Sequence, residues 1–242
     1  MKKWDNNDSR TLIVIPAYNE QANIGNVVRD ALQLENADVL VVDDGSKDYT
    51  IDVASRYGAR VLALPYNLGI GGAVQAGLKY AVVMGYSYVL RLDGDGQHVL
   101  DEGRKLLQAV QNRDVDIAIG SRFVPNSKTY DPSFSRALGI RWFAFMIRTI
   151  TRQAAYDTTS GMQAMNRAAF TFLANYYPQD YPEVEARILI YKANLKTAEF
   201  PVQMSLRMHG NSSITFLRSI YYLFKVSLAT LMTAFRQLSL SH

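Results

Sequence analysis

The segment Tyr88-Val-Leu-Arg-Leu-Asp93-Gly-Asp95-Gly-Gln97-His98 is an apolar stretch that ends in two aspartates and two further polar residues. This pattern predicts a buried strand with carboxylates at its end. Such an arrangement suits a hard divalent cation that bridges phosphate groups, because that cation takes few oxygen ligands from the protein and the rest from substrate and water. Asp and Gly also favour turns, so a simple surface turn explains the segment equally well when it is taken alone.

On both sides of this segment, short apolar runs alternate with segments of helical spacing. We expect strands at residues 11–16, 38–43, 60–64, 88–92 and 116–120, and helices at 20–34, 49–57, 72–84 and 102–112. The alternation predicts an α/β fold with a Rossmann-like, mostly parallel central sheet and flanking helices. Sheets of this kind bind ligands at the carboxyl ends of their strands.

Polar residues follow four of the expected strands. They are Pro16-Ala-Tyr-Asn-Glu20, Asp43-Asp44-Gly45-Ser46, Asp93-Gly-Asp95 and Ser121-Arg122. One such segment alone is explained by helix capping, but four at one edge favour a single nucleotide-binding edge. The first strand lacks the G-x-G-x-x-G that a dinucleotide fold requires. The glycine-rich Leu68-Gly69-Ile-Gly71-Gly72 is either a flexible turn into a helix or a helix N-terminus close to a diphosphate.

The composition is that of a globular protein. The chain has 242 residues, of which 48% are hydrophobic and 20% charged. Its net charge of +4 permits anionic partners but does not require nucleic acid. The absence of cysteine excludes disulfides, thiolate metal sites and cysteine nucleophiles. The first eight residues are charged and polar with no apolar stretch behind them, which does not predict a signal peptide.

The second half shows a less regular pattern. We expect a long helix over 134–152, a polar turn over 157–161, a helix opening at 181–187, a strand over 197–205 and a basic loop from Arg207 to Ser213. Together with the first half, the chain carries seven ordered motifs. They are Ile15-Pro-Ala-Tyr-Asn-Glu20, Val42-Asp-Asp-Gly-Ser46, Leu68-Gly-Ile-Gly71, Asp93-Gly-Asp95-Gly-Gln-His98, Gly120-Ser-Arg122, Thr159-Ser-Gly161 and Arg207-x-x-Gly210-x-Ser212.

With these motifs the chain resembles the family 2 inverting glycosyltransferases, which have a GT-A fold. Within that family it looks most like the dolichyl- and polyprenyl-phosphate sugar synthases, and the resemblance runs from about Leu12 to Ser213. It implies transfer of one sugar from a nucleotide-sugar, preferably a UDP-sugar rather than a GDP-sugar, to polyprenyl phosphate. The product would serve cell-surface glycan assembly.

The resemblance also implies the roles of individual residues. The nucleotide-sugar would contact Pro16, Ala17, Tyr18, Glu20, Asp43, Asp44, Gly45, Gly71, Asp93 and Gly94. A Mg²⁺ or Mn²⁺ ion would be held by Asp93, Asp95 and Gln97. The acceptor phosphate would be received by Arg122, Ser135 and Arg136, with Arg207 on a closing loop. Of these, Asp93, Asp95, Arg122 and Arg136 would be catalytic. Without the resemblance, Arg122 and Arg136 would be read as ordinary surface charges or salt bridges.

Two other functions stay open at this point. A lipid phosphate is already an anionic nucleophile, whereas a sugar hydroxyl needs a general base. A family 2 enzyme that extends a saccharide would find that base among Asp180, Glu183 and Glu185, but Tyr181 stands where the basic Asp is expected, which favours a phosphate acceptor. A non-catalytic nucleotide-binding protein on the same fold is disfavoured by the retained Asp93, Asp95 and Arg122.

We expect a catalytic domain over residues 1–212, with a nucleotide-sugar half at about 10–122 and an acceptor half at about 123–212. An amphipathic helix would occupy 213–242. Its apolar face comprises Leu217, Ile220, Phe224, Leu228, Leu231 and Phe235, and its basic stripe comprises Arg218, Lys225 and Arg236. The segment is too short to span a bilayer. It suits either a membrane surface or packing against the catalytic domain or a second subunit. We therefore expect a peripheral enzyme on the cytoplasmic face of the membrane, with a homo-oligomeric or small membrane-protein partner.

Overall fold

A mixed seven-stranded sheet forms the centre of the molecule in the computed structural model, which describes residues 10–124, 134–179, 182–205 and 216–235. The strands lie in the order β3-β2-β1-β4-β6-β5-β7. They are β1 (Thr11–Ala17), β2 (Ala37–Asp43), β3 (Arg60–Ala63), β4 (Tyr88–Arg91), β5 (Ile117–Ser121), β6 (Gln163–Asn166) and β7 (Thr197–Pro201). Only β6 runs antiparallel to its neighbours among these described strands.

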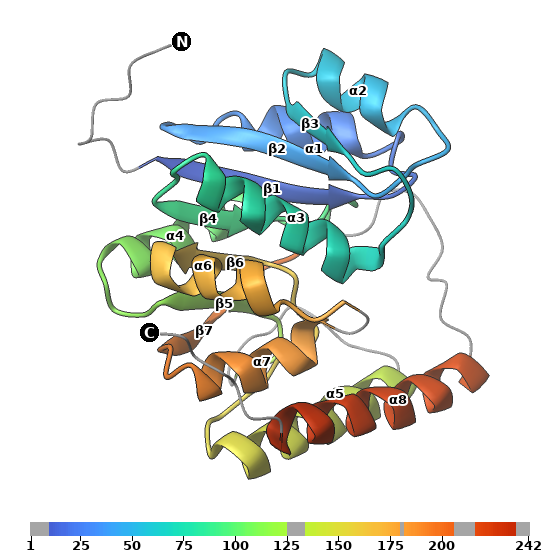
Figure 1. Cartoon of the computed structure of the whole chain (residues 1–242), viewed down its shortest axis with the longest axis vertical. Helices are drawn as coiled ribbons and strands as arrows, with labels where there is room; N and C mark the ends of the chain where they lie inside the picture. Colours follow the sequence, from blue (N-terminus) through green and yellow to red (C-terminus); the bar gives the residue numbers. More distant parts are fainter. Residues whose placement is uncertain (1–9, 125–133, 180–181, 206–215, 236–242) are drawn as a thin grey trace.

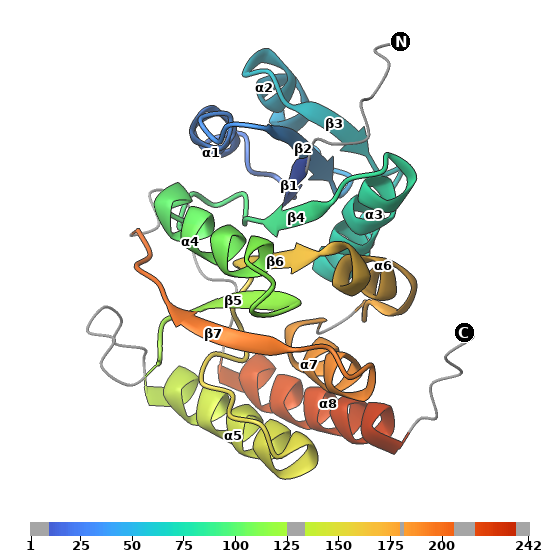
Figure 2. The same ribbon diagram turned by 90° about the vertical axis from the view of Figure 1, so that its left-hand side faces the viewer.

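Helices cover both faces of the sheet (Figures 1 and 2). The helices are α1 (Ile24–Ala31), α2 (Thr50–Arg56), α3 (Gly69–Val83), α4 (Leu100–Gln111), α5 (Phe134–Thr151), α6 (Arg167–Tyr176), α7 (Pro182–Lys192) and α8 (Phe216–Phe235). Helices α1, α2 and α4 lie on one face, and α3 and α6 lie on the other (Figure 2). None of the helices in the described part of the chain is long and apolar enough to cross a membrane.

Strand β1 shows why the sequence adopts this arrangement. All seven of its residues are buried, as expected for a parallel strand with helices on both faces. Successive side chains point to opposite faces, so Leu12 and Val14 join the core under α3 and α6, whereas Ile13 and Ile15 join the core under α1 and α4. A third, smaller apolar cluster joins α5, α7 and α8 through Phe143, Ile147, Val184, Ile188 and Val226.

The α/β fold predicted from the sequence is confirmed, and the expected strands and helices of the first half are all present. Two elements were not predicted. Strand β6 and helix α6 follow the polar turn at 157–161, and β6 inserts between β4 and β5. The helix expected from residue 72 begins at Gly69, so the glycine-rich segment forms its first turn. The strand expected to reach residue 205 ends at Pro201, although Met204 still bridges to His98.

Candidate active site

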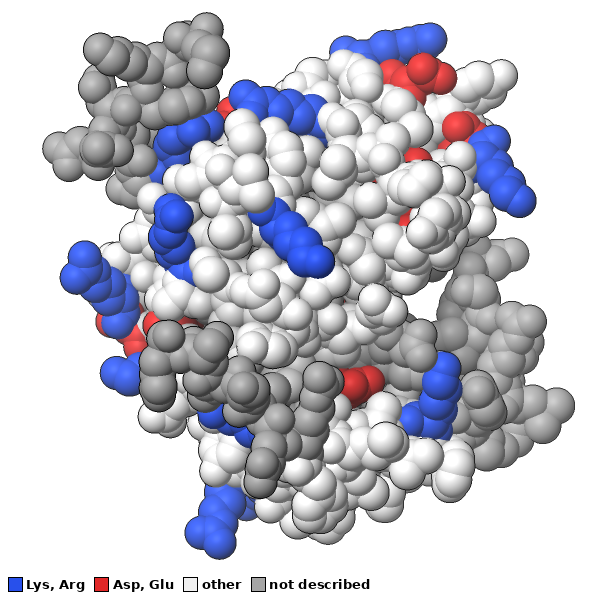
Figure 3. Space-filling model, viewed as in Figure 1, with Lys and Arg blue, Asp and Glu red and all other residues white. Residues whose placement is uncertain are grey.

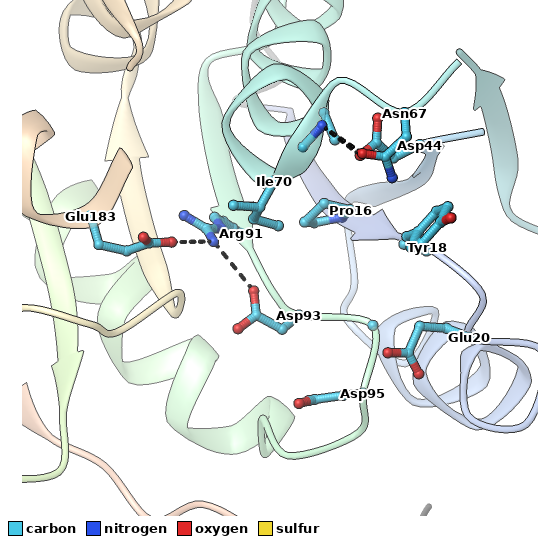
Figure 4. A pocket seen from close by; sticks show the side chains of 14 residues that line it. Pro16, Tyr18, Glu20, Asp44, Asn67, Ile70, Arg91, Asp93, Asp95 and Glu183 are labelled. Atoms are coloured by element: carbon cyan, nitrogen blue, oxygen red, sulfur yellow. Dashed lines mark hydrogen bonds and ion pairs between the residues drawn. The ribbon is translucent and has the colours of Figure 1, made fainter. Parts of the chain in front are cut away.

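A pocket of about 340 Å³ lies where β1, β2 and β4 end (Figure 4). Eight of the residues predicted for the donor and metal line it: Pro16, Ala17, Tyr18, Glu20, Asp44, Asp93, Gly94 and Asp95. The other lining residues are Asn67, Gly69, Ile70, Ala73, Arg91 and Glu183. Four predicted residues, Asp43, Gly45, Gly71 and Gln97, are placed around this pocket but are absent from its lining. The structure therefore brings these eight residues together at the edge of the sheet where the strands end.

The loop after β1 forms one wall of the pocket and is tied to the loop after β2. The Asn19 backbone N–H donates to Ser46 Oγ at 2.9 Å, and the Lys47 N–H donates to Asn19 Oδ1 at 2.9 Å. The Glu20 N–H donates to Thr50 Oγ1 at 2.9 Å. These bonds hold the half-exposed Tyr18 ring at the rim, where it offers a flat apolar surface (Figure 4).

Asp43 and Asp44 have different surroundings although they are adjacent. Asp43 is buried, and its Oδ2 accepts the Ser46 N–H at 3.0 Å. Its Oδ1 has no hydrogen-bond partner among the described residues. Such a buried acceptor is costly unless it is satisfied, and a ligand N–H can satisfy it.

Asp44 binds the start of α3. Its two oxygens accept the backbone N–H groups of Leu68 and Gly69 at 2.7 and 2.9 Å. Burial raises the pKa of Asp44, and these two hydrogen bonds oppose the shift. Asp44 therefore shapes the pocket through helix α3 as well as by lining it.

The glycines beside the pocket are required by close approaches of the backbone. Gly45 has φ +71°, and a Cβ there would lie 2.9 Å from the Asn67 backbone nitrogen. A Cβ on Gly71 would collide with the carbonyl oxygens of Pro178 and Gln179. A glycine at position 71 thus leaves room for the backbone that leads into α7. This packing alone accounts for the glycine, with no need for a diphosphate contact.

Asp93 lies in the middle of the pocket and is held on several sides. The Asp93 backbone N–H donates to His98 Nδ1 at 2.9 Å, which leaves the imidazole proton on Nε2, 3.6 Å from Asp93 Oδ2. Burial lowers the pKa of His98 and so favours this neutral form. A Cβ on Gly161 would lie 2.5 Å from both Asp93 carboxylate oxygens, so the carboxylate rests directly on that glycine.

The charge of Asp93 is stabilised by its surroundings. Burial acts to raise its pKa, but His98, Arg91 and Arg122 outweigh burial and lower it. Asp93 and Asp95 both present carboxylates to the pocket from one loop (Figure 4). The described residues contain no group of three His, Cys, Asp or Glu side chains arranged for a metal. Two carboxylates fit a Mg²⁺ or Mn²⁺ ion that draws its other ligands from a diphosphate and water.

Gln97 supports this loop through its backbone. Its N–H donates to Asp95 Oδ1 at 3.1 Å, and its carbonyl accepts the Ser205 N–H at 2.9 Å. The segment that follows β7 thus passes directly beside the loop that carries Asp93 and Asp95. Arg207 follows two residues later and lies outside the described residues.

Arg91 is a site residue that the sequence reasoning missed. Its side chain is 1% exposed, and it donates from Nη1 to the Tyr177 hydroxyl at 2.8 Å and from Nη2 to Glu183 Oε1 at 3.1 Å. Its Nη2 also lies 3.5 Å from Asp93 Oδ1. Burial acts to lower the pKa of Arg91, but Tyr177, Asp93 and Glu183 raise it. The sequence did contain a signal for this residue, because an arginine within an apolar strand is expected to be buried and a buried charge needs partners.

Arg122 lies at the end of β5 in a buried ion pair. Its Nε and Nη2 bind Asp157 Oδ2 and Oδ1 at 2.7 and 2.9 Å, and Nη2 also donates to Thr159 Oγ1 at 2.9 Å. Burial acts to raise the pKa of Asp157, but Arg122 outweighs it and lowers that pKa. Arg122 therefore has a fixed orientation and lowers the pKa of Asp93, although it does not line the pocket.

The remaining acceptor-site predictions are not tested. Helix α5 includes Ser135 and Arg136, but their side chains lie outside the described part of the chain. Asp180 and Tyr181 are also outside it. Glu183 faces the pocket, whereas Glu185 accepts a hydrogen bond from Thr233 Oγ1 at 3.2 Å and lines a separate hollow.

Known proteins of similar sequence point to one family. The family model described as Glycosyl transferase family 2 matches residues 12–173. A UDP-N-acetylglucosamine–dolichyl-phosphate N-acetylglucosaminyltransferase of Methanococcus voltae is 29% identical over 216 residues, which cover 81% of this chain and 86% of that one. An undecaprenyl-phosphate mannosyltransferase of Micrococcus luteus is 36% identical over 164 residues, which cover 64% of this chain and 65% of that one.

A solved structure has the same fold. The glucosyl-3-phosphoglycerate synthase of Mycobacterium tuberculosis, in complex with Mn²⁺, UDP and glucosyl-3-phosphoglycerate, superimposes with a TM-score of 0.70 at 22% identity. The match covers 93% of this chain and 80% of that one. At this identity the likeness establishes the GT-A architecture alone. With the family model matched over most of the sheet and the whole candidate pocket apart from Glu183, this chain belongs to glycosyltransferase family 2.

Proposed function

We propose that this glycosyltransferase moves one sugar, with inversion, from a nucleotide-sugar to a polyprenyl phosphate, with Mg²⁺ or Mn²⁺ at Asp93 and Asp95. The observation that carries the choice of acceptor is the ion pair between Glu183 and the buried Arg91. Glu183 is the described acidic residue of α7 that faces the pocket, and the pair holds its Oε1 against Arg91 at 3.1 Å. Two relatives with similar sequences are named for transfer to dolichyl phosphate and to undecaprenyl phosphate, which supports the same acceptor class.

We propose one orientation for the donor in the pocket. Tyr18, Glu20 and the unpaired Oδ1 of Asp43 are suited to the base and ribose of a nucleotide, because they offer a flat ring and hydrogen-bond acceptors. Asp93 and Asp95 would then lie near the diphosphate, and Glu183 with Arg91 near the sugar, since these pairs occupy successive positions across the pocket (Figure 4). A divalent cation, when bound, supplies positive charge that stabilises the departing diphosphate.

The proposed reaction needs no proton transfer. An oxygen of the lipid phosphate forms a bond to the anomeric carbon, the bond from that carbon to the nucleoside diphosphate breaks, and the electron pair leaves with the diphosphate. Arg122 would contribute fixed positive charge on the acceptor side, and it would act through this charge because its Nε and Nη2 already bind Asp157 and Thr159. Ser135, Arg136 and Arg207 are proposed to complete the acceptor site.

A saccharide acceptor is the second candidate, because Glu183 does face the pocket. In that case Glu183 would remove a proton from a sugar hydroxyl, either with Oε2 or, after leaving the ion pair with Arg91, with Oε1. Loss of a general base typically reduces the rate by about 10²–10⁴-fold.

The decisive experiment measures nucleoside diphosphate release by the purified protein. Each common UDP- and GDP-sugar is supplied with Mn²⁺ or Mg²⁺, with and without undecaprenyl phosphate. Release that requires the lipid phosphate supports the proposal and identifies the donor. Release that is stimulated only by saccharides contradicts it.

A pair of variants separates the two acceptors. Glu183→Gln keeps the shape of the side chain but cannot act as a base, so we expect transfer to lipid phosphate to remain within about tenfold of wild type. Glu185→Gln is the matched control, because Glu185 lies on the same helix but outside this pocket. If the rate of sugar transfer falls by about 100-fold or more in Glu183→Gln but not in Glu185→Gln, the saccharide acceptor is favoured.

A further inference from the structure

Helices α5 and α8 lie side by side at the end of the molecule beyond β7 (Figures 1 and 2). Both expose large apolar side chains: Leu138, Trp142 and Phe145 on α5, and Phe224, Leu228, Leu231, Met232 and Phe235 on α8. The exposed fractions are high, at 62% for Phe145, 72% for Phe224 and 85% for Phe235. We call this set the α5–α8 face.

The exposed residues of the two helices adjoin at Trp142. Its Nε1 donates to Ser227 Oγ on α8 at 2.9 Å, and its ring lies 6.3 Å from the Phe145 ring. The opposite sides of both helices pack inward with α7, through Phe143, Ile147 and Val226. These apolar side chains therefore point away from the rest of the molecule. In an ordinary surface helix the apolar side faces the core instead.

The two helices carry basic charges only, and the carboxylate of Glu185 on α7 accepts a hydrogen bond from Thr233 of α8. Neither helix contains Asp or Glu, and the last acidic residue of the chain is Glu199. Arg141, Arg148 and Arg152 are exposed along or just after α5, and Lys225 lies on α8. In the view of Figure 3, the lower part of the molecule is mostly white, with several basic side chains and a small acidic patch. A second copy would bring mainly cations against these cations, with the half-buried Glu185 as a carboxylate beside α8, so charge favours an anionic lipid surface over self-association.

We infer that the α5–α8 face docks on an anionic lipid bilayer. Aromatic side chains next to basic ones suit the interface between headgroups and acyl chains, and each cation adds attraction to anionic lipid. Both helices begin on the side of the molecule where β1 and β2 end (Figure 1), so a bilayer against them lies next to the edge that carries the pocket. The inference rests on the proposed function only in that a lipid acceptor would then be within the same membrane.

Trp142 provides a direct test, because the chain has two tryptophans and Trp4→Phe leaves Trp142 as the one reporter. We expect Trp4→Phe to float with phosphatidylcholine vesicles that contain about one third phosphatidylglycerol, and to bind pure phosphatidylcholine at least tenfold more weakly. On binding, Trp142 emission should shift to the blue and should be quenched by lipids brominated on the acyl chain.

Matched charge insertions locate the surface. The double variant Phe145→Glu and Leu228→Glu places two carboxylates on the α5–α8 face, at residues that are 62% and 50% exposed. It should reduce partition onto the anionic vesicles by more than about tenfold. Val83→Glu is the control, since Val83 is 82% exposed near the end of α3, away from this face, and it should bind as wild type does.

The outcomes separate this inference from the proposed function. Transfer to a short-chain, water-soluble prenyl phosphate in the absence of vesicles should be equal in the double variant and wild type. If that soluble reaction fails in both proteins while flotation succeeds, the proposed function is wrong and the docking surface stands. No flotation of wild type, equal flotation of all variants, or a lipid-free dimer that the double variant abolishes would each overturn the inference.

Discussion

Gly161 supports the candidate metal ligand Asp93 although it does not line the pocket. A Cβ at this position would lie 2.5 Å from both oxygens of the Asp93 carboxylate. We therefore predict that Gly161→Ala displaces Asp93 and weakens binding of UDP in the presence of Mn²⁺ by at least tenfold, measured by calorimetry. Gly103→Ala is the control, because its added methyl meets only the flexible Leu90 and Leu92 side chains. Unchanged affinity in Gly161→Ala would show that Asp93 has room to move.

Asp157 is a buried charge whose loss should lower stability. It is fully buried and binds Arg122 through both oxygens. Removal of one partner from a buried ion pair leaves the other charge uncompensated, which typically costs about 3–5 kcal/mol. We predict that Asp157→Asn lowers the free energy of unfolding by about 3 kcal/mol in urea titrations.

The exposed pair between Arg104 and Asp101 is the control for this prediction. Its side chains are 40% and 73% exposed, and surface ion pairs contribute at most about 1 kcal/mol. Asp101→Asn should therefore change the free energy of unfolding by less than about 1 kcal/mol. Equal effects of the two substitutions would show that the Arg122–Asp157 pair adds no stability.

At the scale of elements, helix α3 depends on a carboxylate from another strand. Asp44, just beyond β2, accepts the N–H groups of Leu68 and Gly69, and hydrogen bonds to charged groups contribute about 1.5–3 kcal/mol. We predict that Asp44→Asn accelerates hydrogen exchange of these two amides at least tenfold in the ligand-free protein. Asp52→Asn, on the exposed side of α2, should leave them unchanged; equal exchange rates in wild type and Asp44→Asn would refute the anchoring role.

The first-half elements were predictable because their patterns are local. Strands β1, β2 and β4 are short apolar runs followed by polar residues, and that order places Asp44, Asp93 and Asp95 at one edge. Strand β6 was missed because Gln163–Asn166 begins and ends with an amide residue and contains no β-branched or aromatic residue, whereas the equally short β3 and β4 contain valine. Its place between β4 and β5 depends on pairing with strands far away in the sequence.

The partners of Arg91 could not be predicted for the same reason. Tyr177 and Glu183 follow it by 86 and 92 residues, and no periodic pattern connects such positions. The arginine itself was visible within an apolar strand, but only the three-dimensional structure shows that it joins β4 to the start of α7. Asp157 was likewise read as part of a turn, because its ion pair with Arg122 is not a local feature.

At the scale of the whole molecule, buried ion pairs connect the sheet to the layer of α5, α7 and α8. Arg187 of α7 binds Glu199 of β7 at 2.8 Å, and Glu199 accepts the Asp157 N–H at 3.0 Å. Asp157 in turn binds Arg122 of the loop after β5. The two layers are therefore joined by charge as well as by the apolar cluster of α5, α7 and α8.

This connection predicts a dependence of stability on acid pH. Arg122 lowers the pKa of Asp157 in the folded protein, against the effect of burial. In the unfolded chain the pKa of an aspartate is about 3.9. As pH falls below about 5, the Asp157 carboxylate is therefore protonated in the unfolded chain before it is protonated in the folded protein. The contribution of Asp157 is complete above that range and is lost as pH falls through the lower folded-state pKa. The difference in unfolding free energy between wild type and Asp157→Asn should thus shrink from pH 6 to pH 3 in urea titrations. A constant difference would contradict it.

The position of β6 has a consequence for synthesis of the chain on the ribosome. Strand β5 is complete at Ser121, yet its two sheet neighbours are β6 and β7, which end at Asn166 and Pro201. At about 5–20 residues per second, β5 waits several seconds for its first partner to be translated. During that time its buried residues, Ile117 to Ser121, have unpaired edges on both sides. A nascent chain stalled within this interval therefore exposes an apolar strand with two open edges, which favours aggregation unless a chaperone covers it.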